Sequence, residues 1–267
     1  MELRAQFGLQ ATPFTRELPV RHRFTHGQFD DVLQELRQVI EERMSAALIA
    51  PAGTGKTALV RALCDALPEA RYRIHYVKVA SLSKRDMCRA ITAALAIPSA
   101  GSTPGLIRNI QAAVENAALA DGLRTLLIFD DAHELRPDVL GLLKTLTNYA
   151  MDSQLLLSLL LIGQAPLAEL LRRSELEDVA RRLAHYATLR PLSRDETRAY
   201  VIHRCTVAGA TTEPFDDGAH DAIFEIGRGN LRATDRLALK ALHLAARKAC
   251  DVVDHTMVIE ARKALWP

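Results

Sequence analysis

The sequence has no apolar run long enough to cross a membrane. Its longest, LLLSLLLIG from Leu155 to Gly163, is about half of what a membrane-spanning helix of roughly 20 residues needs. The amino terminus, MELRAQFGLQATPF, carries the acidic Glu2 and no sustained apolar core, so it does not resemble a secretory leader. These features predict a cytoplasmic protein without a membrane partner.

The sequence also has few cysteines and a small net charge. The four cysteines form no CxxC pair and lie far apart, which predicts reduced and mostly buried thiols. Lys and Arg number 34 against 32 for Asp and Glu, so the formal net charge of +2 neither favours nor excludes a polyanionic partner. Because 49% of the residues are hydrophobic and 25% are charged, the composition excludes disordered and fibrous architectures.

Strand-like and helical segments alternate along the first 190 residues. Short apolar runs bounded by polar residues predict strands buried on both faces. These runs are Ala46–Ala50, Ile74–Ala80, Thr125–Phe129, Leu155–Ile162 and Tyr186–Leu189. Helical patterns accompany these runs. One covers Phe29–Arg43, and a second begins at the cap Thr103–Pro104 and ends at Asp121–Gly122. A third is the apolar stripe of Val139, Leu140, Leu143 and Leu146. The alternation predicts an α/β fold with a parallel sheet and helices on both faces.

The pattern changes after Pro191. Ser193 and Glu196 fit a capping box that opens a helix, and only helical segments follow, over 194–208, 216–227, 230–250 and 255–265. We therefore expect an α/β domain over residues 1–190, with an amino-terminal extension over 1–28, and a small all-helical domain over 191–267.

The segment APAGTGKT, Ala50 to Thr57, has the spacing of a phosphate loop. It lies between a predicted strand and a predicted helix, where backbone N–H groups and the helix dipole attract phosphate. Lys56 is expected to reach the β- and γ-phosphates, and the Thr57 hydroxyl to ligate Mg²⁺. Ala50 stands where this motif usually has glycine. The expected nucleotide contacts are Pro51, Ala52, Gly53, Thr54, Gly55, Lys56, Thr57 and Ala58.

The second motif is the acidic segment LLIFDDAHEL, which extends from Leu126 to Leu135. Its apolar residues predict a buried strand that presents Asp130 at the carboxyl tip, where open α/β sheets bind ligands. Asp130 is expected to hold magnesium, through water or through Thr57. Asp131 stands where ATPases with a phosphate loop usually carry a glutamate that polarises the attacking water. Because aspartate is one methylene shorter, its reach is reduced and slow hydrolysis is expected.

Three further residues are candidates by position. Gln164 follows the strand that ends at Gly163, which suggests a γ-phosphate sensor. Arg182 comes after one more helix, and Arg232 begins a long helix in the carboxyl-terminal segment; arginine suits the charge of a transferring phosphoryl group. Taken alone, each arginine is more often a solvated or ion-paired surface residue.

Basic residues cluster between Arg71 and Arg89, where six face a single acid, Asp86. Such a cluster, repeated in an oligomer, predicts salt-dependent and sequence-independent contact with a DNA backbone. The residues expected to contact DNA are Lys78, Lys84, Arg85 and Arg89.

With these motifs in this order, the chain resembles an AAA+ P-loop ATPase. More narrowly, it resembles the family that unites ExeA-like secretion ATPases with MuB-, TniB- and TnsC-like ATPases of DNA transposition. The resemblance extends over most of the chain. It rests on FGLQATPF (Phe7–Phe14), LLIGQAPLAELL (Leu160–Leu171), Ala180–Gly209 and Gly227–Leu242. It implies that Arg182 is an arginine finger between protomers, that Arg232 is a second sensor, and that the region Phe24–Phe29 contacts adenine.

The resemblance implies ATP and Mg²⁺ as ligands, a homo-oligomeric ring or filament, and an ATPase that double-stranded DNA stimulates. Because the chain ends at Pro267 without the membrane span of ExeA-like proteins, we expect a regulator of transposition that recruits a DDE transposase. The alternative is a secretion ATPase, or another ATP-driven switch that does not act on DNA. A neighbouring gene for a transposase or for secretion components distinguishes the two.

Overall fold

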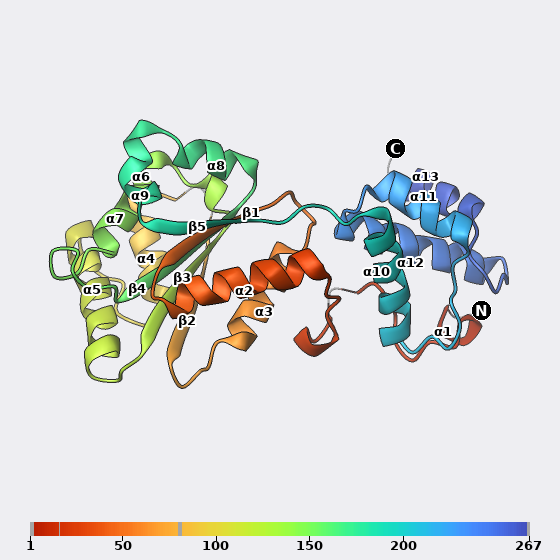
Figure 1. Cartoon of the computed structure of the whole chain (residues 1–267), viewed down its shortest axis with the longest axis horizontal. Coiled ribbons are helices and arrows are strands. Elements are labelled where there is room, and N and C mark those ends of the chain that lie inside the picture. The colour runs from red at the N-terminus through yellow and green to blue at the C-terminus, as the bar shows by residue number, and fades with distance from the viewer. Residues whose placement is uncertain (1–2, 16, 80–81, 266–267) are drawn as a thin grey trace. The chain divides into compact units, whose positions relative to one another are not determined.

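The computed structural model describes residues 3–15, 17–79 and 82–265. Five strands form one parallel sheet in the order β2-β3-β4-β1-β5 (Figure 1). Their bounds are β1 Ser45–Ile49, β2 Tyr72–Lys78, β3 Arg124–Asp130, β4 Leu157–Gly163 and β5 Leu183–Thr188. The expected α/β fold with a parallel sheet is therefore confirmed. Ala80, the last residue of one predicted strand, lies outside the described residues.

Both faces of the sheet are buried along its three central strands, β3, β4 and β1, whereas the edge strands β2 and β5, also expected to be buried on both faces, carry exposed residues. Leu127 and Phe129 of β3 belong to one apolar cluster with Leu159 and Leu161 of β4 and with the helices on that face. The alternate residues, such as Leu126 and Ile128, point to the opposite face and are also fully buried. This two-sided burial explains why β1, β3 and β4 appear in the sequence as continuous apolar runs.

Helices connect the strands and cover the sheet (Figure 1). The first part of the chain contains α1 Leu3–Gln6, α2 Gly27–Glu41, α3 Lys56–Ala66, α4 Lys84–Ala94, α5 Thr103–Leu119, α6 Pro137–Leu140, α7 Leu142–Leu146, α8 Ala165–Leu171 and α9 Glu177–Ala180. Three 3₁₀ turns, η1 Val20–His22, η2 Ala132–Glu134 and η3 Ser174–Leu176, lie among them. Among the described residues, no helix is apolar over a length that spans a bilayer.

Two local expectations need correction. Ser102, one residue before the expected cap, closes the start of α5, because its hydroxyl accepts a hydrogen bond from the Gly105 N–H at 3.4 Å. The apolar stripe that begins at Val139 is divided between two short helices, α6 and α7, which meet at Gly141.

Four helices follow β5: α10 Arg194–Val207, α11 Asp217–Gly227, α12 Leu231–Arg247 and α13 His255–Leu265. The expected capping box at the start of α10 is confirmed. The Ser193 hydroxyl accepts from the Glu196 N–H at 3.2 Å, and the Glu196 carboxylate accepts from the Ser193 N–H at 2.7 Å.

The chain forms two compact units that do not follow a single cut at residue 190. One unit contains residues 28–51 and 59–189, and the other contains 1–27, 52–58 and 190–267. We expected the amino-terminal extension to belong with the α/β domain. Instead, Leu3, Phe7, Leu9 and Phe14 pack into the apolar cluster of α10–α13, because that cluster offers the buried surface that a short segment lacks by itself.

Arg204 of α10 ties the amino-terminal segment to the helical unit. It is only 7% exposed, and its guanidinium donates to the Tyr200 hydroxyl at 2.8 Å and to the Thr15 carbonyl at 2.6 Å. Asp235 of α12 lies 3.6 Å away and supplies the opposite charge that a buried arginine requires.

Candidate nucleotide-binding site

The candidate phosphate loop begins directly after β1. Ala50 is 2% exposed, and its N–H donates to the Gly163 carbonyl at 3.0 Å, which joins the ends of β1 and β4. The backbone at Ala50 is not in the left-handed region that favours glycine. An alanine is therefore compatible with the loop at this position.

The loop then takes the conformation that its glycines permit. Gly53 has φ +78° and Gly55 has φ +100°, and α3 begins at Lys56. The residues expected to bind nucleotide thus form a turn and the first helical turn of α3, with Thr57 exposed and Thr54 buried. Backbone N–H groups at the start of a helix, followed by a lysine, are suited to a polyphosphate.

Asp130 ends β3 beside the end of β4 and is held by two hydrogen bonds. The Tyr76 hydroxyl donates to Oδ2 at 2.6 Å, and the Asp131 N–H donates to Oδ1 at 3.0 Å. Asp131 itself has φ +55°, a left-handed backbone that aspartate tolerates better than most residues. Such strain often occurs at functional sites.

Gln164 lies at the amino-terminal cap of α8, at the same edge of the sheet. Its side-chain amide is 3.0 Å from His133 Nε2, in the 3₁₀ turn η2 that follows Asp131. Neither His133 nor Tyr76 was predicted to be a site residue. Parallel pairing of β2 with β3 brings Tyr76 beside Asp130, and pairing of β3 with β4 brings His133 beside Gln164.

The candidate arginines are in different surroundings. Arg182 precedes β5, is 21% exposed, and donates to Asp152 Oδ2 at 2.7 Å; this hydrogen bond lowers the pKa of the Asp152 carboxyl. The preceding residue, Arg181, was not a candidate; it is 71% exposed and pairs with Glu177. Arg232 is exposed in the first turn of α12.

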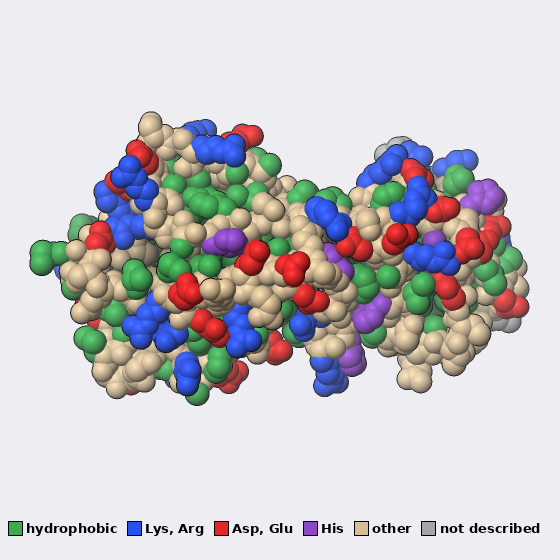
Figure 2. All heavy atoms as spheres, viewed as in Figure 1, with side chains coloured by type: hydrophobic (Ala, Val, Ile, Leu, Met, Phe, Trp, Pro, Cys, Tyr) green, Lys and Arg blue, Asp and Glu red, His purple; other side chains and the backbone are tan. Residues whose placement is uncertain are grey.

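The residues expected to contact DNA lie on one strand end and one helix. Lys78 is the last residue of β2, and Lys84, Arg85 and Arg89 are on α4; all four are exposed. The Arg85 guanidinium donates to the Gly101 carbonyl at 3.1 Å. On the face that Figure 2 displays, Lys and Arg side chains are interspersed with Asp and Glu.

Phe24, in the region expected to contact adenine, packs against the protein's own aromatic side chains. Its ring centroid is 5.5 Å from that of Tyr200, 5.6 Å from that of His203 and 5.9 Å from that of His26. This cluster fixes the segment after η1 against α10.

The donor set suits magnesium bound together with a nucleotide. Among the described residues, no three His, Cys, Asp or Glu side chains form a cluster that could hold a metal alone. Magnesium is usually bound by one or two carboxylates plus substrate phosphates, so Asp130 and the Thr57 hydroxyl are the kind of donors that it requires.

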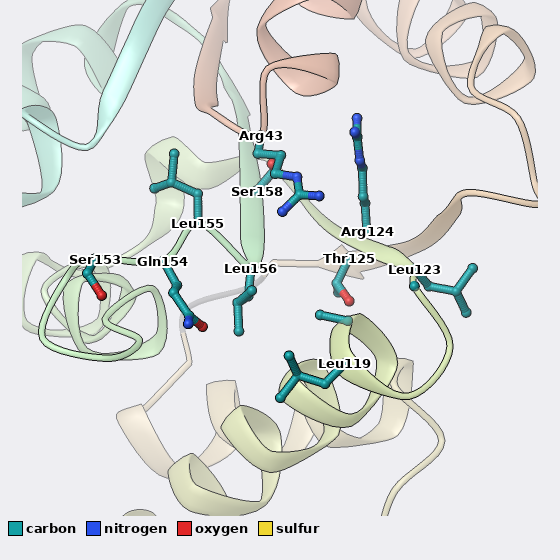
Figure 3. A pocket seen from close by; sticks show the side chains of 12 residues that line it. Arg43, Leu119, Leu123, Arg124, Thr125, Ser153, Gln154, Leu155, Leu156 and Ser158 are labelled. Atoms are coloured by element: carbon teal, nitrogen blue, oxygen red, sulfur yellow. The ribbon is translucent and has the colours of Figure 1, made fainter.

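A cavity of about 510 Å³ lies at the opposite edge of the sheet (Figure 3). Arg124 and Thr125 from the start of β3 and Ser158 from β4 line it, together with Leu119 and Leu155. Because β3 runs from Arg124 to Asp130, this cavity is separate from the strand ends that carry the candidate motif.

Comparison with known proteins identifies the family. A family model described as an AAA domain matches residues 37–171, which contain the phosphate loop, Asp130 and Gln164. The chain belongs to the AAA family of ATPases. It is 30% identical over 252 residues to general secretion pathway protein A of Aeromonas hydrophila. That match covers 93% of this chain and 46% of the relative, so the chain spans about half of the relative's length.

Solved AAA structures share the fold. Cdc6p of Pyrobaculum aerophilum superposes with a TM-score of 0.72 at 20% identity, over 94% of this chain and 70% of that one. The ORC1 protein of Aeropyrum pernix, solved in complex with DNA, gives 0.70 at 19% identity, over 93% and 68%. At such identities the likeness establishes the AAA fold alone.

The contact between Tyr76 and Asp130 predicts an unusual tyrosine titration. Partial burial of the half-exposed Tyr76 side chain raises its pKa, and the hydrogen bond to Asp130 and the charges of Asp130 and Asp131 raise it further. We expect Tyr76 to stay protonated well above the ordinary value of about 10. Because the folded-state pKa is raised, the contribution to stability is complete below about pH 10 and is lost as the pH rises through the folded value.

An NMR titration of ¹³C-labelled tyrosine measures this pKa. Asp130→Asn should lower the pKa of Tyr76 towards its ordinary value, whereas Asp138→Asn, a substitution of an exposed acid paired with Arg136, should leave it unchanged. Ionisation of wild-type Tyr76 near the ordinary tyrosine pKa of about 10 would show that the contact is absent.

Proposed function

We propose that this chain binds Mg·ATP and hydrolyses it to ADP and phosphate, as the ATPase part of a protein similar to general secretion pathway protein A. The observation that carries the proposal is the loop with left-handed Gly53 and Gly55 that leads into α3 at Lys56. The secretion alternative is favoured by 30% identity over 93% of the chain. Because the chain spans 46% of that relative, its end at Pro267 no longer favours transposition.

In this proposal each residue has a separate task. The amides of Gly53–Thr57 and the Lys56 ammonium bind the phosphates. Thr57 and Asp130 hold the magnesium ion, whose charge in phosphoryl transfer offsets that on the phosphates. Asp131 orients the attacking water, and Gln164, held by His133, contacts the γ-phosphate. The reduced reach of Asp131 makes turnover slow.

Arg182 acts on a neighbouring protomer's nucleotide. One face of a protomer then meets a different face of the next, and such a head-to-tail interface produces rings or helical filaments. Within the protomer Arg182 is held by Asp152, so the guanidinium has a defined position before assembly. Arg232 on α12 contributes a second positive charge. A cytoplasmic location stays a prediction.

Lys56→Ala tests nucleotide binding. Loss of a charged donor to phosphate should weaken the affinity for Mg·ATP at least about 10-fold. Isothermal titration calorimetry with a non-hydrolysable ATP analogue measures it, with Lys263→Ala of α13 as the control that keeps wild-type affinity. The proposal is wrong if the wild-type protein has no magnesium-dependent affinity, or if Lys56→Ala binds as tightly as the wild type.

Arg182→Ala tests the catalytic step. Turnover should fall by about 10³-fold or more while nucleotide binding is retained, because the arginine is needed only for the transition state. Arg181→Ala, next in sequence and paired with Glu177, should change turnover little. In the same phosphate-release assay, Asp131→Glu should raise turnover. Equal rates for Arg182→Ala and the wild type would exclude the arginine finger, and no gain in Asp131→Glu would exclude the short-acid explanation.

A second candidate function is the DNA-dependent one, in which the ATPase assembles on duplex DNA and recruits a transposase. It is favoured by the exposed Lys78, Lys84, Arg85 and Arg89, which have only Asp86 as an acid near them in sequence. A structural neighbour, the ORC1 protein, was solved with DNA, although the likeness is one of fold.

Fluorescence anisotropy with a labelled duplex and a non-hydrolysable ATP analogue tests this candidate. In the double variant Lys84→Glu, Arg89→Glu, affinity should fall and the salt dependence should lose about one unit of slope per side chain removed from phosphate. The matched control is the double variant Arg262→Glu, Lys263→Glu in the last turn of α13, which should bind as the wild type does. Binding that is absent, or equal in the two double variants, excludes DNA contact by α4.

A further inference from the structure

The start of α12 is attached to the phosphate loop by two hydrogen bonds. The Asn230 side-chain amide donates from Nδ2 to the Ala52 carbonyl at 2.6 Å, although the two residues are 178 positions apart. The Leu231 N–H donates to the Gly53 carbonyl at 2.9 Å. Two consecutive carbonyls of the loop are therefore satisfied by two consecutive residues of the helical segment.

These bonds engage carbonyl acceptors of the loop and not its backbone N–H groups. A phosphate loop binds through backbone N–H groups, whereas Ala52 and Gly53 contact α12 through their carbonyl oxygens. The attachment can therefore persist when a triphosphate is bound.

The approach of Asn230 is close enough to require glycine in the loop. A Cβ placed on Gly53 would lie 2.3 Å from Asn230 Oδ1, and the φ of +78° independently disfavours a side chain there. A Cβ on Gly55 would lie 3.0 Å from Leu231 Cδ1. Asn230 and Leu231 thus pack directly on the two glycines that shape the loop.

Asparagine meets two requirements at once. Its Oδ1 accepts from the Ala233 N–H at 3.1 Å, which caps α12, while its Nδ2 holds Ala52. Serine or aspartate caps a helix about as well. The cap alone therefore does not require asparagine. The bond to Ala52 does, because aspartate has no N–H to donate and the serine side chain is shorter than that of asparagine.

We propose that Asn230 is a positioning residue that holds the phosphate loop in its nucleotide-binding shape and couples it to the helix that carries Arg232. This inference rests on the proposed function, because the ligand is a nucleoside triphosphate. Loss of the Nδ2 bond frees the loop to relax, so ordering it costs part of the binding free energy. Without this bond, the loop and α12 are less tightly coupled. The position of Arg232, two residues after Asn230 on α12, is then less closely tied to the shape of the loop.

Two substitutions separate the loop contact from the cap. Asn230→Asp and Asn230→Ser both retain a cap acceptor for Ala233, and loss of the single bond to Ala52 should lower the melting temperature by no more than about 4 °C. Each should weaken the affinity for a fluorescent ATP analogue with Mg²⁺ by about 3- to 10-fold, the effect of one hydrogen bond. Asp216→Ser, which changes the cap of α11, is the matched control and should leave the affinity unchanged.

Hydrogen exchange without nucleotide gives a second readout. Amides of the segment 52–57 should exchange faster in both Asn230 variants than in the wild type or Asp216→Ser. The inference is overturned if exchange in this segment is unchanged, or if only Asn230→Asp weakens binding, since its added charge then explains the loss. If the wild type fails to bind nucleotide, the proposed function fails, whereas the exchange data still decide whether Asn230 holds the loop.

Discussion

Parallel pairing of the strands is the constraint on which the candidate site depends. Because β1, β3 and β4 run in the same direction, their carboxyl ends meet at one edge of the sheet. Asp130, Gln164 and the start of the phosphate loop each lie at the end of one of these strands. The hydrogen bond between the Ala50 N–H and the Gly163 carbonyl joins two of the ends directly.

The loop requires a further restraint, because a glycine-rich turn has many conformations of similar energy. Helix α3 fixes one end of the loop, and Asn230 and Leu231 fix carbonyls near its centre. Hydrogen bonds also restrain the side chains at the strand ends. Tyr76 and the Asp131 N–H hold both oxygens of Asp130, and His133 holds Gln164. The side chains proposed to contact a nucleotide are thus oriented by residues to which the sequence motifs assign no role, such as Tyr76 and His133.

Much of the fold was predictable because burial on both faces of a sheet leaves a local signature. The apolar runs located all five strands, and the Ser193–Glu196 spacing located the start of α10. The glycine-rich loop and Asp130 could be placed at strand ends because the proposed chemistry requires particular residues at fixed spacing, and their part in nucleotide binding stays a prediction. Tyr76, Asp152 and Asn230 were not identified, since each acquires its partner only through pairing or packing between distant segments. The preference for transposition rested on where the chain ends, and similarity to a secretion protein now favours the alternative.

The most direct measurement is hydrogen exchange of the backbone amides of Gly53–Thr57 with and without a Mg·ATP analogue. If these amides bind the triphosphate, their exchange should slow strongly on addition of the analogue with magnesium, and this protection should be absent in Lys56→Ala. Unchanged exchange at saturating analogue, or protection confined to other parts of the chain, would contradict a phosphate site in this loop.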